Sequence, residues 1–248
     1  MKITVLGCGS SNGVPEIACK CNVCTSNAPY NKRTCSAIVI EDKDTKILVD
    51  FGYDIKHQLV NNGIMNLDAA ILTHDHADHV SGLDHLKIFN FLYKKPLKIY
   101  MDNYSMVNLS KRYNYLVEAK QIEFEQIDFY DKVTIKNLQL QFFKQHHGKK
   151  INSIGIRVNN FVYSSDVKDF PQKTWPFLQN INLWILDCIG FESTSSHCGL
   201  DKVIKWYKEF LPKKLYLTNM THHIDYFEIQ KHLPVNVKPC YDGMVLSI

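Results

Sequence analysis

The chain has 248 residues, of which 45% are hydrophobic, with a formal net charge of +4 and a pI near 8.5. This length is enough for one α/β domain with a sizeable core, so we expect residues 1–248 to form a single domain. No run of about 18 apolar residues is present, which excludes a helical membrane span. The lysines lack the dense clustering of many nucleic-acid-binding proteins. Because no apolar signal segment is apparent, we expect a cytoplasmic protein whose thiols are reduced.

The N-terminal segment predicts a strand at residues 3–6, followed by a glycine-containing loop at residues 7–13. The loop lacks the lysine and following Ser or Thr of a P-loop, so we interpret it as a tight turn near the site. Cys19, Cys21 and Cys24 follow within six residues. In a reducing compartment such spacing favours thiolate ligands of a structural zinc ion, with free surface cysteines as the alternative. No nearby histidine supplies a fourth ligand.

The next apolar runs predict strands at residues 37–40 and 47–50, then a helix at residues 54–61. Asp50 ends the second of these strands. Its carboxylate could accept the N–H of a metal-binding histidine and so orient the ring. Alternatively, Asp50 simply starts the turn that its Asp-x-Gly sequence indicates.

The most informative motif follows residues 69–72, whose apolar character predicts a buried strand. The motif comprises His74, His76, Asp78 and His79, the last two opening a segment that looks helical over residues 77–86. In extended chain, His74 and His76 point to the same side. Imidazole and carboxylate suit Zn, Mn or Fe, and two such ions close together activate water near neutral pH. The motif therefore predicts a metal-dependent hydrolase.

This H-x-H-x-D-H pattern resembles the signature of the metallo-β-lactamase superfamily, and the likeness extends along nearly the whole chain. The resemblance implies a four-layer αββα sandwich of the α/β class, with two catalytic divalent metals, Zn or Mn, at its edge. It also implies a third histidine for the first metal, for which His147 is favoured over His146 because Gly148 follows it. Asp166, at the end of the apolar run 161–165, matches the carboxylate that bridges both metals. By itself, such an aspartate is more often a turn or cap residue.

The last metal ligand is where this chain departs from the family. The position after Leu217-Thr218 that commonly carries histidine is Asn219. An amide oxygen is a neutral and weaker ligand than imidazole. We therefore expect the second metal, bound by Asp78 and His79, to be held less tightly or to tolerate Mn.

A narrower resemblance is to the cyclic phosphodiesterase of the bacterial carbon–phosphorus lyase pathway (PhnP) and its relatives. The matching stretches are Gly13-Val14-Pro15 before the cysteines, Leu186-Asp187-Cys188, His197-Cys198 and Tyr241-Asp242-Gly243-Met244. In that branch the fourth zinc ligand follows the late Leu-Thr, which implies His222, with His223 as the competitor. The branch also places His197, ahead of the amphipathic segment 200–210, beside the metals, where it could protonate the leaving group. We expect His197 and Asp78 to be the catalytic residues.

The expected reaction is hydrolysis of a small phosphate ester of nucleotide or phosphoribosyl type, cyclic esters included, by a hydroxide that bridges two metals. The same metal ligands also occur in hydrolases of thioesters, lactones or RNA. Because Asn219 would be a weak metal ligand, a nucleotide-sensing protein with weak catalysis is a further alternative. We expect no membrane partner, and we regard nucleic acid as a disfavoured partner. A homodimer is an open alternative. Aromatic residues within 87–136 could shape the substrate pocket, although packing is their commoner role.

Overall fold

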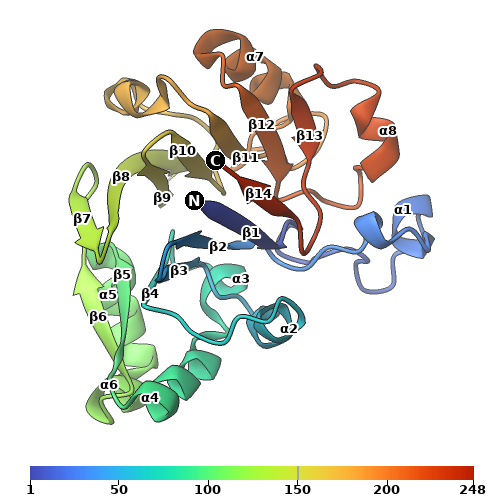
Figure 1. The fold of residues 1–248 in the computed structure, drawn as a ribbon. Helices are drawn as coiled ribbons and strands as arrows, with labels where there is room; N and C mark the ends of the chain where they lie inside the picture. Colours follow the sequence, from blue (N-terminus) through green and yellow to red (C-terminus); the bar gives the residue numbers. More distant parts are fainter. Residues whose placement is uncertain (150) are drawn as a thin grey trace.

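The computed structural model describes residues 1–149 and 151–248, which fold into two seven-stranded sheets packed face to face (Figure 1). In the first sheet the spatial order is β14 (Val245–Ser247), β1 (Lys2–Gly7), β2 (Ala37–Asp42), β3 (Thr45–Val49), β4 (Ala69–Ile71), β5 (Leu97–Met101) and β6 (Ile122–Gln126). In the second it is β13 (Val237–Pro239), β12 (Lys214–Thr218), β11 (Leu183–Asp187), β10 (Phe161–Ser164), β9 (Ile151–Val158), β8 (Leu138–His147) and β7 (Lys132–Ile135). Helices cover the outer faces, so the fold is the expected αββα sandwich.

The helices divide between the two sheets (Figure 1). Those near the first sheet are α2 (Ile55–Asn61), α3 (Ala77–Val80), α4 (Ile88–Tyr93), α5 (Asn103–Arg112) and α6 (Asn114–Glu118), while α7 (Leu200–Phe210) and α8 (Tyr226–Gln230) lie near the second. The short α1 (Asn22–Thr25) stands out from the sandwich in the N-terminal loop. In the described residues, three 3₁₀ helices, Pro29–Asn31, Leu83–Lys87 and Gln172–Leu178, complete the elements.

Both faces of the central strands are buried, as the continuous apolar runs predict. Along β2, Ile38 and Ile40 pack into the cluster that includes the second sheet, whereas Val39 packs into the cluster beneath α2 to α6. This alternation follows from the two-residue period of a strand. Helix α7 meets the sandwich with its apolar stripe, burying Val203, Trp206 and Phe210.

Two predicted helices are interrupted in the structure. The segment 77–86 divides at Gly82, whose amide donates to Phe51 O at 2.9 Å. A Cβ there would lie 2.2 Å from Gly52 O, so the chain turns where only glycine fits. The segment 105–116, whose sequence also predicts a helix, divides at the buried Tyr113, whose φ of −116° is not helical. Periodicity alone did not reveal either break.

Several strands end at the same edge of the sandwich. β3 and β4 run parallel in the first sheet, and β10, β11 and β12 run parallel in the second. Ligand sites in α/β sheets form beyond the carboxyl ends of such strands. Among the described residues, no helix combines the length and apolar character needed to cross a bilayer.

Candidate active site and metal-binding groups

Three polar residues lie at or just beyond the ends of strands and share an unusual backbone conformation. Asp50 follows β3, Asp166 lies just beyond β10, and Asn219 follows β12, with φ values of 62°, 51° and 58°. Left-handed φ is uncommon outside glycine, although Asp and Asn tolerate it best. Such strain persists where the surrounding structure determines it, and it clusters at functional sites. All three residues are at most 3% exposed.

The first group of potential metal ligands contains His74, His76 and His147, whose ligand atoms lie within 4.8 Å of one another. His147 Nε2 is 3.2 Å from His76 Nδ1. Burial holds the pKa of His74 well below its usual value, and its buried Nε2 has no hydrogen-bond partner among the described residues. A neutral imidazole with a free nitrogen in such a group is suited to metal binding. His146, the competitor of His147, instead pairs with Asn152 Oδ1 at 3.2 Å.

The second group contains His74, His79 and Asp166. His79 Nε2 lies 3.0 Å from Asp166 Oδ2 and 3.2 Å from Asp78 Oδ2, so Asp78 borders this group. Asp50 accepts from the opposite ring nitrogen, His79 Nδ1, at 2.8 Å, which is the orienting contact expected of it. Burial opposes a charge on His79, yet the carboxylates of Asp166 and Asp50 hold its pKa well above the usual value.

The third group contains His147, Asp166 and His197. His197 Nδ1 pairs with Asp187 Oδ2 at 2.8 Å, and the same oxygen accepts the Val167 N–H at 2.9 Å. Burial lowers the pKa of His197, but the charge of Asp187, its hydrogen bond and the charge of Asp166 together outweigh burial and raise the pKa to about 9. The other ring nitrogen, Nε2, is 3.7 Å from Asp166 Oδ1 and faces the metal-binding groups.

Sequence reasoning missed the role of Asp187. The residue attracted attention only within the Leu186-Asp187-Cys188 stretch, and nothing local pairs it with a histidine ten residues later. The pairing forms because the loop that carries His197 returns over the end of β11. There Cys198 N donates to Val167 O at 2.7 Å, and Cys198 Sγ donates to Asp187 O at 2.9 Å.

Together these residues fit a pair of divalent metal ions. Imidazole nitrogens and carboxylate oxygens converge from both sheets, and they are the donors that Zn and Mn accept. His74, His76 and His147 would hold one ion, Asp78 and His79 the other, and Asp166 would contact both. The unpaired, buried His74 Nε2 supports this assignment, because a buried polar atom without a partner is costly.

Asn219 reaches the site, but in a different way from the expected ligand. Its Nδ2 donates to Asp166 Oδ2 at 2.6 Å, and its buried Oδ1 has no partner among the described residues. The amide group therefore presents a donor to the shared carboxylate in place of an oxygen for a metal. Binding of a metal through Asn219 Oδ1 would require the side-chain amide to flip by about 180°.

We expect Asn219→His to tighten binding of the second ion by about tenfold or more, because imidazole is a stronger ligand than an amide. Calorimetric titration of metal-free protein with Zn²⁺ and Mn²⁺ would measure both affinities. Asn219→Ala, which removes the amide without adding a ligand, is the matched control. Two ions bound tightly and equally by the wild type would show that Asn219 does not weaken the site.

A cavity of about 640 Å³ opens onto the metal-binding groups. Besides those groups, its lining includes Ser10, Ser11, Lys149, Ile189 and Ser196. No residue from 87–136 is among the described lining residues, so the suggestion that those aromatic residues shape this pocket is wrong. Phe89 and Phe91 instead line a separate groove beside α2 and α4.

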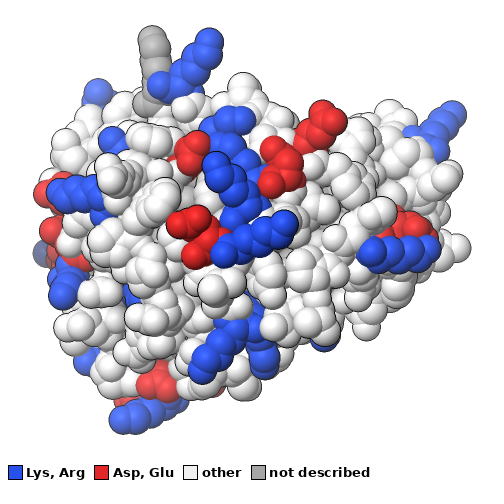
Figure 2. Space-filling model, turned by 90° about the horizontal axis from the view of Figure 1, so that it is seen from above, with Lys and Arg blue, Asp and Glu red and all other residues white. Residues whose placement is uncertain are grey.

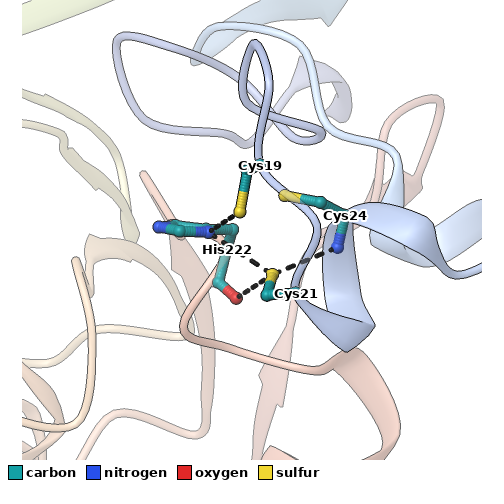
Figure 3. Close-up of side chains that lie close together, drawn as sticks. All are labelled: Cys19, Cys21, Cys24 and His222. Carbon is teal, nitrogen blue, oxygen red and sulfur yellow. Dashed lines mark hydrogen bonds between the residues drawn. The ribbon is translucent and has the colours of Figure 1, made fainter.

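The N-terminal cysteines lie beside His222, as the expected zinc site requires (Figure 3). Ligand atoms of Cys19, Cys21, Cys24 and His222 all lie within 4.8 Å of one another, and His222 Nδ1 is 3.1 Å from Cys19 Sγ. A hydrogen bond from the Cys24 backbone, the largest influence, helps lower the pKa of Cys21 to about 6. Three thiols and an imidazole form a donor set suited to structural zinc. The His223 ring lies 4.3 Å from that of His222 between centroids, in a tilted arrangement, but His223 is not among these four.

Arg33, which sequence reasoning also missed, holds the segment that carries His222. This guanidinium is only 2% exposed, and it donates to Thr221 O at 3.0 Å and Ile224 O at 2.7 Å. The backbone of Arg33 pairs with Val14 in the cysteine-bearing loop, with N–H···O distances of 2.8 and 2.9 Å. Arg33 therefore joins the two segments that supply the zinc donors.

Two curated proteins are similar to this chain over all or part of its length. A protein called octanoyltransferase from Porphyromonas gingivalis is 26% identical over 98% of this chain and 51% of its own length. Ribonuclease Z from Methanopyrus kandleri is 28% identical over 48% of this chain and 43% of its own length. The chain thus spans about half the length, or less, of these curated relatives.

Solved structures share the whole fold. A diphosphatase from the PhnP family superposes with a TM-score of 0.94 at 25% identity, over 99% of this chain and 97% of its own. Zinc-bound PqqB from Methylobacterium extorquens gives 0.87 at 15% identity, over 100% of both chains, which is a likeness of fold alone. The family description "Beta-lactamase superfamily domain" matches residues 45–222, which include every catalytic-site residue discussed above except Ser10 and Ser11. The chain therefore belongs to the beta-lactamase superfamily, whose members are typically metal-dependent hydrolases.

Proposed function

We propose that the protein is a metal-dependent phosphodiesterase that hydrolyses a small phosphate ester of nucleotide or phosphoribosyl type. The observation that carries this proposal is the pairing of His197 with the buried Asp187, which directs one ring nitrogen of the histidine toward the shared carboxylate of Asp166. A phosphodiester has a poor leaving group, and a proton donor placed beside the metals assists its departure.

The comparisons agree with phosphate chemistry. Two of the similar proteins are a diphosphatase and a ribonuclease, and the first matches this chain over nearly its full length. The cavity of about 640 Å³ has the size of a small-molecule site. On the face seen in Figure 2, acidic side chains lie beside the basic ones.

The roles of the chain's own residues follow from their positions. When bound, a pair of divalent ions would supply activation of water and neutralisation of charge on the phosphoryl oxygens. His197, positioned by Asp187 and protonated near neutral pH, would donate its proton to the leaving oxygen. Asp78 lines the cavity and would orient the attacking water by accepting a hydrogen bond.

A thioester or acyl-ester hydrolase is the second candidate. The observation that favours it is the match to the octanoyltransferase, whose name refers to acyl transfer. The match covers only 51% of that protein, so the name can describe its other half. The same metal-binding groups can polarise a carbonyl as well as a phosphoryl oxygen.

Turnover of matched substrates distinguishes these proposals. Protein reconstituted with Zn²⁺ or Mn²⁺ would be assayed with bis(4-nitrophenyl) phosphate, a 2′,3′-cyclic nucleotide, a thioester and a lactone. We expect phosphodiesters to be hydrolysed, and His197→Ala to lower kcat about 10²- to 10⁴-fold, the usual contribution of general acid catalysis. The metal content of this variant should stay unchanged.

His146→Ala is the matched control, because His146 neighbours a metal-binding histidine but pairs with Asn152. Its turnover should equal that of the wild type. Hydrolysis of the thioester alone would support the second candidate. Binding of a nucleotide without turnover under any metal would indicate a sensor.

A further inference from the structure

The carboxylate of Glu16 lies between the zinc donors and a turn of the active-site cavity. Its Oε2 is 3.3 Å from His222 Nε2, and its Oε1 accepts the side-chain N–H of Asn12 at 3.1 Å. The side chains of Glu16 and His222 are 26% and 17% exposed, so their contact is largely shielded from solvent. One carboxylate therefore contacts both segments.

The two ring nitrogens of His222 have different neighbours. Nδ1 faces the thiols, at 3.1 Å from Cys19 Sγ and 3.5 Å from Cys21 Sγ (Figure 3). Nε2 instead lies beside Glu16 Oε2. A histidine that binds a metal through one nitrogen usually donates its other N–H to such a carboxylate, which fixes the orientation and the tautomer of the ring. Glu16 thus favours the form of His222 in which Nδ1 can bind zinc.

The backbone of Glu16 is held among the cysteines independently of its side chain. The Glu16 N–H donates to Cys24 Sγ at 3.4 Å, and the Cys19 N–H donates to Glu16 O at 3.2 Å. Neither contact involves the carboxylate. Substitution of Glu16 therefore removes the carboxylate and leaves the groups that position the thiols.

The Asn12 end of this connection belongs to a turn that borders the cavity. The turn spans residues 10–13 and is closed by the Gly13 N–H, which donates to Ser10 O at 2.8 Å. Ser10 and Ser11 line the cavity, whereas the next residue, Asn12, is exposed. A contact with Asn12 can therefore restrain the turn from outside the cavity.

We propose that Glu16 is a positioning residue that connects the structural zinc site with the active-site cavity. Through Oε2 it orients His222 for zinc, and through Oε1 it restrains the turn at Asn12. A carboxylate accepts at both oxygens, whereas an amide of the same size accepts at only one, so Glu16→Gln can keep one contact but not both. Neither contact involves a substrate, and this role of Glu16 is independent of the proposed phosphodiesterase function.

Zinc affinity and the ring proton of His222 test the first contact. We expect Glu16→Ala to lower the affinity for the chelator-resistant zinc ion about 10- to 100-fold, the usual effect of removing such a partner from a ligand histidine. Competition with a chromophoric chelator measures this affinity. In magnetic resonance spectra of the zinc-loaded protein, wild-type His222 should show a slowly exchanging Nε2–H that Glu16→Ala lacks. Ile17→Ala is the matched control, because this neighbouring residue is 99% exposed, and it should retain both properties.

Hydrogen exchange of the Gly13 amide tests the second contact. Exchange should become about 2- to 10-fold faster in both Glu16→Ala and Asn12→Ala, the factor for the net strength of one hydrogen bond. Asn12→Ala should keep wild-type zinc affinity, because it leaves the contact between Glu16 and His222 in place.

The outcomes for the two contacts are separate. Unchanged zinc affinity, or an undiminished Nε2–H signal, in Glu16→Ala would overturn the role of Glu16 in orienting His222. Gly13 exchange at the wild-type rate in Glu16→Ala or Asn12→Ala would overturn the connection to the cavity. Should Glu16→Ala misfold, Glu16→Gln carries the test, and wild-type values of all three measurements in that variant would overturn the proposal. Absence of phosphodiester hydrolysis in the wild type would reject the proposed function and leave these measurements unaffected.

Discussion

Asp166→Ala should remove the catalytic metal ions and lower phosphodiester hydrolysis by about 10⁴-fold or more, because activation of water and charge neutralisation are lost together. Asp166 belongs to two of the three ligand groups at this site and borders the donors proposed for both ions. It also faces His79 Nε2 at 3.0 Å. Removing the carboxylate would leave the His79 charge buried with less compensation.

Metal content by mass spectrometry and turnover of bis(4-nitrophenyl) phosphate would measure the effect of Asp166→Ala. Asp169→Ala is the matched control, since Asp169 lies three positions later but its side chain is 56% exposed and pairs with Lys202. This control should keep its metal and its activity. Full metal content in Asp166→Ala would contradict the assignment of the shared ligand.

Cys21→Ser should eliminate the structural zinc and destabilise the protein. Wild-type protein purified in the presence of a chelator should retain about one tightly bound zinc ion per chain, because closed thiolate sites exclude competing ligands. The site joins residues 203 positions apart in the sequence, Cys19 and His222. Loss of this connection should lower Tm by about 10 °C or more, since structural zinc contributes directly to folding free energy.

Zinc content by mass spectrometry and Tm by calorimetry would test this expectation. Cys35→Ser serves as the control, because Cys35 is a thiol of the same loop region that contacts Ser11 O and is not among the four donors. Unchanged zinc content in Cys21→Ser would reject the site.

The structural zinc site and the catalytic site share one segment of the chain. Loss of the zinc ion should therefore also affect catalysis. Asn219 and His222 lie on the same short stretch, and Met220 between them donates to Cys8 O at 3.0 Å. Cys8 directly precedes the Gly9–Ser10 segment that enters the cavity wall. We therefore expect Cys21→Ser also to weaken catalytic turnover, although none of the four zinc donors lines the cavity.

Local sequence was sufficient for features whose parts are close in the chain. His74, His76, Asp78 and His79 could be recognised together because a strand end and a short helix determine their relative positions. The apolar runs predicted individual buried strands, and the family resemblance implied that these form the two layers of an αββα sandwich. The family resemblance extended this to His147, Asp166 and His222, which lie in or beside the expected groups.

The tertiary structure decided the contacts between distant segments, since no spacing in the chain encodes them. The order of β10, β11 and β12 brings Asp166, Asp187 and Asn219 to one edge, and there Asp187 meets His197 while the Asn219 amide donates to Asp166. The structure also shows that Asn219 faces the Asp166 carboxylate with its amide nitrogen and not with its oxygen. The H-x-H-x-D-H motif by itself indicated metal-dependent hydrolysis. The positioning of the proton donor and the cavity walls depended on how the two sheets pack, because those contacts form only when both sheets are assembled.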